Sequence, residues 1–348
     1  MAMIKGVGDF FGLDIGTNAV RVVQLSPVGP GKWALRHYGY APIDLKTATA
    51  NSAEAKQRLG EVIMTVVGQS GIKAKNVAVG LSASKTFVTV IDMPMTSESE
   101  LKSTIKYQLD QYIPMPLEEA KVDWSLLGTS LHDPSKQEVL LASTSMVYAE
   151  DRLELVESLG FDVIAAEPET LASIRSLSSQ SAQGAQVVVD VQDQVINVGI
   201  LYNDAPRLVR SIPSGLSTFV RAAVQNLNVQ EDQARQFVLK FGLAPDKLEG
   251  QVVRALENTA EGVASELQKS IKFFQTRYPS ITVGTVLLAG YASVIPQLDR
   301  YLASKIGIQT MVVSPWQKVS VPSGDQNFAS IAPEFSVAVG LAQRKNLL

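Results

Sequence analysis

The stretch FGLDIGTNAVR, residues 11–21, decides the fold class of this 348-residue chain. The apolar residues on either side of Gly16-Thr17-Asn18 predict two β-strands joined by a tight turn. A glycine just past a strand end lets backbone amides come close to an anion, and Thr17 and Asn18 can add hydrogen bonds to phosphate oxygens. A plain hairpin turn remains the alternative interpretation of these residues taken alone.

Two charged side chains beside this turn extend the phosphate interpretation. A bare carboxylate would repel phosphate, so Asp14 is expected to act through a hydrated magnesium ion, which prefers carboxylate and water ligands. Arg21 can compensate negative charge with its forked set of donors.

A second stretch, VVVDVQDQ at residues 187–194, repeats the pattern of an apolar strand, an aspartate, a short turn and another strand. Asp14 and Asp190 lie about half the chain length apart. Short β-branched runs alternate with amphipathic helical stretches around both of them, which is typical of a layered α/β protein. We therefore predict an α/β fold of two related lobes, with the two aspartates facing one cleft.

Composition excludes several classes of function. The chain is 46% hydrophobic and contains no cysteine, which removes disulfides, thiolate metal sites and cysteine nucleophiles. Its only two histidines, His37 and His132, are far apart in sequence, which argues against a zinc enzyme. The near-balanced net charge of −3 argues against a nucleic-acid partner. The start of the chain holds no apolar run of signal-peptide length, so we expect a cytoplasmic protein.

Four blocks of sequence resemble one family from end to end: FGLDIGT at 11–17, YIPMPLEE at 112–119, SPW at 314–316 and PEFSVAVGLA at 333–342. They are similar to the PilM family, cytoplasmic actin-like proteins of type IV pilus assembly in the actin/Hsp70/FtsA superfamily. The resemblance implies an actin-like (ribonuclease H-like) two-lobed fold with an FtsA/PilM-type inserted subdomain. The first lobe would span 1–185 with the insertion at about 86–165, and the second would span 186–348, with a C-terminal helix returning toward the first.

The resemblance also implies a cleft that binds ATP or ADP with magnesium. Asp14 and Asp190 would hold the magnesium ion through water, and Glu169 falls where relatives place a residue near the attacking water. One face of a helix and a short loop would contact the adenosine. The residues expected to bind the nucleotide are Asp14, Gly16, Thr17, Asn18, Arg21, Asp190, Asp193, Glu266, Lys269, Ser270, Phe273, Gly290 and Tyr291.

Alternatives stay open at several of these positions. The helix face could pack in the ordinary way, with Phe273 in the core, and Tyr291 could either stack on a base or fill its space. Gln192 stands where the family usually has a glycine, so its side chain can block close backbone approach or oppose a positive φ. We therefore predict weak or absent ATP affinity and leave hydrolysis doubtful.

The inserted region is implied to bind a partner, the N-terminal cytoplasmic tail of a PilN-like inner-membrane protein. That contact would place the chain at the inner face of the cytoplasmic membrane, peripheral to it, and a pilus motor ATPase is a further expected partner. An apolar stripe and a proline-bounded extended segment supply the expected contacts, although such a stripe can equally pack a helix on its own sheet. The expected partner-binding residues are Leu101, Ile105, Leu109, Tyr112, Ile113 and Met115.

These features favour an actin-like adaptor of type IV pilus assembly, with nucleotide as a structural or switching ligand. The alternatives are an active ATPase or kinase of the same superfamily, and the related actin-like component of a type II secretion system. Robust ATP turnover that depends on Asp14 would favour the enzyme.

Overall fold

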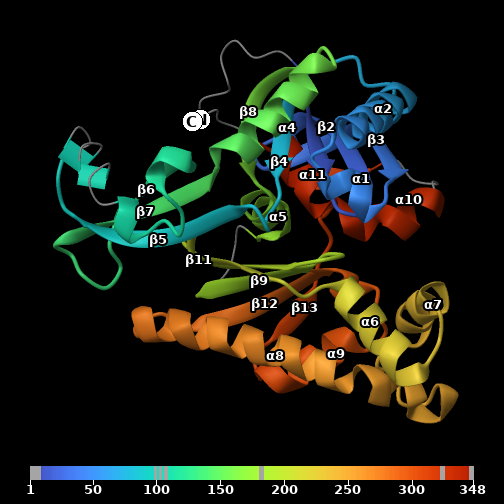
Figure 1. Cartoon of the computed structure of the whole chain (residues 1–348). Coiled ribbons are helices and arrows are strands. Elements are labelled where there is room, and N and C mark those ends of the chain that lie inside the picture. Colours follow the sequence, from blue (N-terminus) through green and yellow to red (C-terminus); the bar gives the residue numbers. More distant parts are fainter. Residues whose placement is uncertain are drawn as a thin grey trace.

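The computed structural model describes residues 9–97, 100–101, 104–105, 109–179, 184–321 and 326–344. Two mixed β-sheets covered by helices form an upper and a lower lobe, and a smaller sheet projects to one side (Figure 1). The predicted α/β fold is confirmed. No described helix is both long enough and apolar enough to cross a membrane.

The first sheet is built around the hairpin that the sequence predicts. Strands β1 and β2 pair antiparallel, β3 continues the meander, and β4 and β8 extend the sheet in parallel from β1. The strand order is β14-β3-β2-β1-β4-β8. The strands are β1 (Phe10–Ile15), β2 (Ala19–Gly29), β3 (Lys32–Pro42), β4 (Asn76–Leu81), β8 (Asp162–Pro168) and β14 (Val319–Ser320).

The second sheet repeats this connectivity, with an antiparallel meander followed by two parallel strands. Its order is β11-β10-β9-β12-β13, so β9 takes the place that β1 has in the first sheet. Both aspartates of the repeated motif therefore lie at the same point of their sheets. The strands are β9 (Ala185–Val191), β10 (Ile196–Tyr202), β11 (Ala205–Ile212), β12 (Val283–Gly290) and β13 (Thr310–Val312).

Helices cover both sheets, because each helix has one apolar face that packs against a sheet. The helix α2 begins after Ser52, whose side chain accepts from the Ala55 amide, and ends at Gly71 in the left-handed conformation. Helices of the first lobe are α1 (Leu45–Thr49), α2 (Ala53–Ser70), α4 (Met146–Ser158) and α5 (Glu169–Leu177). Those of the second are α6 (Leu216–Leu227), α7 (Glu231–Phe241), α8 (Gln251–Arg277) and α9 (Leu298–Ile306).

The C-terminal segment comes back to the first sheet, where α10 (Gln326–Ile331) precedes the short 3₁₀ turn η5 (Ala332–Phe335) and α11 (Ser336–Ala342). A Cβ at Gly12 of β1 would lie 2.5 Å from the Ala338 carbonyl oxygen, and one at Gly340 would lie 1.8 Å from the Ala172 carbonyl oxygen of α5. Two glycines thus let α11 pack directly between β1 and α5. This packing brings η5 to the cleft between the lobes.

The small sheet is antiparallel, in the order β5-β7-β6. It lies beside both lobes in Figure 1 and is called the inserted sheet below. One edge strand, β5, lies toward β11 of the second lobe, whereas β6 forms the other edge. The strands are β5 (Thr86–Pro94), β6 (Ala120–Thr129) and β7 (Lys136–Ser145).

Candidate functional site

The first turn is a tight hairpin whose glycine is required by a close contact. The Gly16 amide donates to the Ala19 carbonyl at 3.1 Å. Asp14 and Arg21 are cross-strand partners, and the Arg21 Nη1 atom lies 3.4 Å from the Asp14 Oδ2 atom. A Cβ on Gly16 would come within 2.7 Å of the same nitrogen, so glycine is needed for the guanidinium to lie over the turn. Both charged side chains are buried.

A second carboxylate, from the C-terminal segment, also binds this turn. Glu334 of η5 forms an ion pair with the Arg21 Nη2 atom. The Asn18 Nδ2 atom donates to Glu334 at 3.2 Å, and the Asn18 Oδ1 atom accepts from Arg21 at 2.9 Å. Asn18 and Arg21, which were predicted to contact phosphate, thus bind a carboxylate of the same chain.

The second turn closes without the backbone strain that the sequence suggested. The Gln192 amide donates to the Val195 carbonyl at 2.9 Å, and Gln192 is not among the residues with positive φ. Its side chain instead occupies space in the cleft, where the Nε2 atom donates to Asp190 at 2.8 Å. Ser336 of α11 donates to the same Asp190 oxygen at 2.6 Å. Glutamine therefore affects this turn by filling the cleft, not by opposing a positive φ.

The opposite wall is closed by Tyr291, which begins the 3₁₀ turn η4 (Tyr291–Ser293) after Gly290. Its hydroxyl accepts from Asn18 at 3.3 Å and from Arg235 of α7 at 3.4 Å. The ring is buried and lies 6.0 Å from the Arg235 guanidinium carbon. Tyr291 therefore fills part of the cleft in this structure.

These contacts leave a cavity of only about 60 Å³ between the two turns. Well-formed ligand sites have roughly 300–1,000 Å³, so a nucleotide does not fit the cleft in this conformation. The described residues that line it include most of those predicted for the two turns, together with Glu169. They are Ile15, Gly16, Thr17, Asn18, Arg21, Ser82, Ser84, Glu169, Asp190, Val191, Gln192, Asp193, Gln194, Val195, Gly290, Tyr291, Pro333, Glu334 and Ser336.

Burial raises the pKa values of three carboxyl groups at the cleft. Burial raises the pKa of Asp14 to about 6, against the opposing effect of Arg21. Burial, followed by repulsion from Asp14, raises the pKa of Glu169 to about 8, and burial raises the pKa of Asp190 as well. Asp14, with a pKa of about 6, is still mostly ionised at neutral pH beside Arg21, whereas Glu169 is mostly protonated there.

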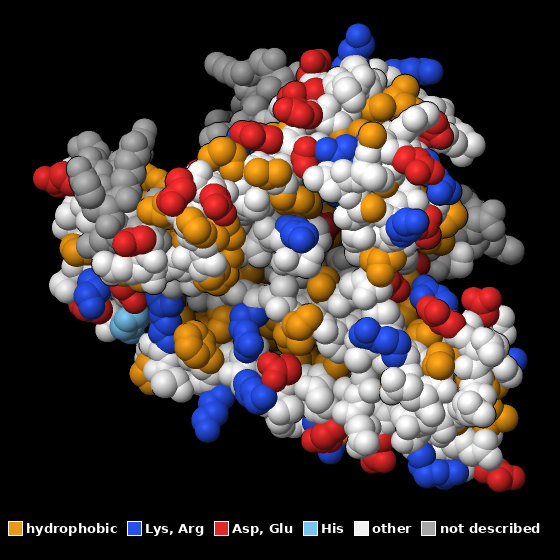
Figure 2. All heavy atoms as spheres, in the orientation of Figure 1, with side chains coloured by type: hydrophobic (Ala, Val, Ile, Leu, Met, Phe, Trp, Pro, Cys, Tyr) orange, Lys and Arg blue, Asp and Glu red, His pale blue; other side chains and the backbone are white. Residues whose placement is uncertain are grey.

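The helix face predicted to contact adenosine lies elsewhere. None of its four described residues lines the cleft. Ser270 is buried and accepts from Arg210 of β11 at 3.0 Å, and Glu266 pairs with Lys269 at 2.7 Å. Phe273 is 61% exposed, so it does not lie in the core as the alternative interpretation placed it. Figure 2 shows hydrophobic and basic side chains together on this part of the second lobe, beneath the inserted sheet.

The residues predicted to bind a partner mostly pack on the inserted sheet. Leu101 and Ile105 are buried in a cluster with Met93 and Val139, and Tyr112 packs against that cluster. Ile113 is also buried, Met115 is partly buried, and the Leu109 side chain lies outside the described residues. Leu101 and Ile105 are covered by their own chain, because the stripe packs its helix on the sheet.

An open groove of about 710 Å³ lies instead between the inserted sheet, the first lobe and the β10–β11 hairpin. Sequence patterns did not reveal it, because its walls come from segments far apart in the chain and β8 was not predicted. Its lining combines apolar side chains with four cations and three carboxylates. Residues that line the groove include Trp33, Lys121, Asp123, Trp124, Leu140, Ala142, Leu153, Glu167, Leu171, Arg175, Leu201, Asp204, Lys318 and Arg344.

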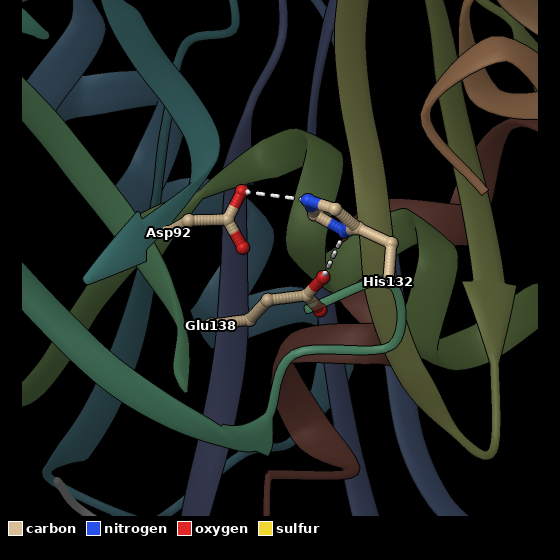
Figure 3. A group of neighbouring side chains, drawn as sticks. All are labelled: Asp92, His132 and Glu138. Atoms are coloured by element: carbon tan, nitrogen blue, oxygen red, sulfur yellow. Dashed lines mark ion pairs between the residues drawn. The ribbon is translucent and has the colours of Figure 1, made fainter. Parts of the chain in front are cut away.

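A third polar cluster joins the inserted sheet to the second lobe. His132 lies between the carboxylates of Asp92 and Glu138, its two ring nitrogens 3.4 and 3.8 Å from their oxygens (Figure 3). Among the described residues, this is the group of three His, Asp or Glu side chains close enough to share a metal ion. Arg277 binds Asp92 at 2.9 Å, and Arg207 forms an ion pair with Glu138. Two guanidiniums already neutralise the carboxylates, so the cluster is an ion-paired junction.

Comparisons with known proteins agree with this architecture. A family model described as "Type IV pilus assembly protein PilM" matches residues 12–346. A solved PilM-PilN type IV pilus biogenesis complex has a TM-score of 0.83 at 21% identity, over 97% of this chain and 98% of that chain. The ethanolamine utilization protein EutJ from Carboxydothermus hydrogenoformans has a TM-score of 0.53 at 13% identity, over 98% and 93%. MreB 5 of Spiroplasma citri bound to AMPPNP has 0.52 at 11%, over 95% and 94%.

The two lobes share one connectivity and face each other across a cleft. The chain is similar to these proteins over nearly its whole length, so its class is that of an actin-like α/β protein. Because the PilM model matches nearly the whole sequence, the chain belongs to the PilM family of type IV pilus assembly proteins. The predicted fold and family are both confirmed.

Proposed function

We propose that this chain is a cytoplasmic actin-like adaptor that binds the N-terminal tail of a PilN-like inner-membrane protein in the open groove. The observation that carries the proposal is the groove itself, whose volume of about 710 Å³ lies within the range of ligand sites. The similar solved structure is a PilM-PilN complex, which motivates the choice of partner.

The groove favours an extended peptide over a compact ligand. Residues 121–125 of β6 line it, and β6 is an edge strand of the inserted sheet. An exposed edge offers backbone donors and acceptors to an added strand, and alternate side chains of that strand can then enter apolar pockets. Leu140, Leu153 and Leu171 supply the apolar surface for such side chains.

Charged groups at the groove fix the orientation of a tail. Glu167 is held by Arg175 and Arg344, so its charge is already compensated within the chain. Lys121 and Asp123 on β6 are exposed and can pair with charges of the tail. A tail bound there would hold the chain at the inner face of the cytoplasmic membrane, and a pilus motor ATPase remains a further proposed partner.

We assign nucleotide no step in tail binding. ATP or ADP with magnesium is the ligand that the actin-like class suggests, and the similar MreB 5 structure is bound to AMPPNP. The closed cleft of about 60 Å³ does not fit it, so we propose neither ATP hydrolysis nor a catalytic role for Glu169.

The test is a calorimetric titration of the chain with a synthetic peptide of the partner's cytoplasmic tail and with a scrambled peptide. Wild type should bind only the authentic sequence. Leu153→Asp puts a charge on the groove wall and should weaken binding at least thirtyfold, whereas Val147→Asp, on the exposed side of the same helix, should not. Equal binding by both variants would disprove the groove assignment.

A further inference from the structure

The closed cleft contains an anion of its own. The Oε2 atom of Glu334 accepts from both the Arg21 guanidinium and the Asn18 amide at the first turn. Arg21 and Asn18 are the donors that the sequence offers to a phosphate oxygen. A carboxylate bound by charge-assisted hydrogen bonds at this point presents the same negative oxygen that a phosphate would.

The same C-terminal segment also binds the second turn. Ser336, two residues beyond Glu334, donates to Asp190 at 2.6 Å, and Gln192 donates to Ser336 at 3.3 Å. One short segment therefore contacts both turns, each of which belongs to a different lobe. It connects the lobes from inside the cleft, in the place where a nucleotide would bridge them.

Contacts across the cleft mouth complete this connection. Tyr291 of the second lobe accepts from Asn18 of the first, and Arg235 donates to both Tyr291 and Asp193. The Asn18–Tyr291 contact joins residues 273 apart in sequence and crosses between the lobes, whereas both Arg235 contacts lie within the second lobe. A cavity of about 60 Å³ remains, which has room for about two water molecules.

We propose that the C-terminal segment keeps the two lobes closed without a nucleotide, with Ser336 binding the second turn and Glu334 acting as an intramolecular substitute for nucleotide phosphate at the first turn. The first turn then retains its anion-binding donors but uses them for the chain's own C-terminal segment. This internal contact does not require the partner proposed above. It predicts that pyrophosphate binds the same donors once the charge of Glu334 is removed, and not while Glu334 occupies them.

The experiment compares full-length wild type with Glu334→Gln, which keeps the size of the side chain and removes its charge. Hydrogen–deuterium exchange is followed at residues 16–19 and 290–294, with and without millimolar pyrophosphate. Glu334→Gln should speed exchange at both segments at least tenfold, and pyrophosphate should restore part of the protection. Wild type should show no change with pyrophosphate or with magnesium ATP. Glu257→Gln, an exposed glutamate on α8, is the matched control.

Each other outcome contradicts a stated part of the proposal. Unchanged exchange in Glu334→Gln would show that this carboxylate does not hold the lobes. Faster exchange without recovery by pyrophosphate would show that it does not occupy an anion site. Tight binding of magnesium ATP to wild type would show that the cleft opens readily to nucleotide. If Glu334→Gln does not fold, the wild-type titrations and Tyr291→Phe, which removes only the hydroxyl shared by Asn18 and Arg235, test the same closure.

Discussion

The cleft and the groove both lie where separate parts of the chain meet, yet one is closed and the other is open. The cleft of about 60 Å³ is filled by charged and polar side chains that bind one another. The groove of about 710 Å³ has an apolar floor and an edge strand, and the ion pairs of Glu167 with Arg175 and Arg344 leave it open. In this actin-like chain the cleft predicted to bind nucleotide is filled by the chain's own side chains, and the open groove lies beside the inserted sheet.

The open shape of the groove depends on how the inserted sheet is held against the second lobe. Glu138 is fully buried, and its ion-pair partner Arg207 of β11 is nearly so. This pair is buried on the side of the inserted sheet that faces β11, and the β10–β11 hairpin supplies one wall of the groove. The groove therefore takes its shape from a junction that lies outside the cleft.

The largest expected effect comes from breaking that junction. Glu138→Ala leaves the Arg207 guanidinium buried without its partner and should lower the free energy of unfolding by about 3–5 kcal/mol. Tail binding should weaken as well, because the groove wall loses its support. Urea denaturation and the peptide titration measure the two effects. Asp133→Ala, at an exposed ion pair near the same loop, should change stability by less than about 1 kcal/mol. Equal effects of the two variants would show that the junction contributes little.

The pH dependence of stability distinguishes the cleft from the groove. The pKa of Glu169 is about 8 in the folded chain, above its ordinary value of 4.5, so the native state keeps a proton that the unfolded state releases. Stability should therefore fall as the pH rises from about 4.5 to about 8, by an amount on the order of a few kcal/mol. Glu169→Gln should be more stable than wild type at pH 8.5 and nearly equal to it at pH 5, as measured by denaturant unfolding. A parallel pH dependence in both proteins would contradict the raised pKa.

Filling the groove should affect the partner and leave the cleft unchanged. Ala142 lies on the groove floor on β7, so Ala142→Trp should reduce tail affinity about thirtyfold, or about 2 kcal/mol, by occupying the space of the peptide. Leu126→Trp, on an exposed position of β6 that does not line the groove, is the control. Hydrogen exchange at residues 16–19 should be the same in both variants. Full affinity in Ala142→Trp would show that the tail binds at another surface.

Sequence reasoning found what local patterns determine and missed what tertiary packing determines. The two hairpins follow from strand periodicity and turn residues, the C-terminal helix is implied by the family resemblance, and the structure contains all three. The edge strands β13 and β14 are three and two residues long, too short to show a period. The role of Glu334 depends on contacts with residues more than 300 positions away in sequence. The sequence of a helix face, such as the one that contains Phe273, does not reveal which part of the chain packs against it.

The smallest expected effect concerns Gln192, the residue from which we predicted weak ATP binding. Gln192→Gly restores the usual glycine, but it removes only the hydrogen bonds to Asp190 and Ser336, and should cost about 1 kcal/mol of stability. Because Glu334 and Tyr291 still fill the cleft, calorimetry should detect no gain in magnesium ATP binding. The double variant Gln192→Gly/Glu334→Gln should bind pyrophosphate no less tightly than Glu334→Gln alone. A clear gain of ATP affinity in Gln192→Gly alone would show that Gln192 prevents ATP binding at the second turn. It would also show that Glu334 is not needed to prevent it.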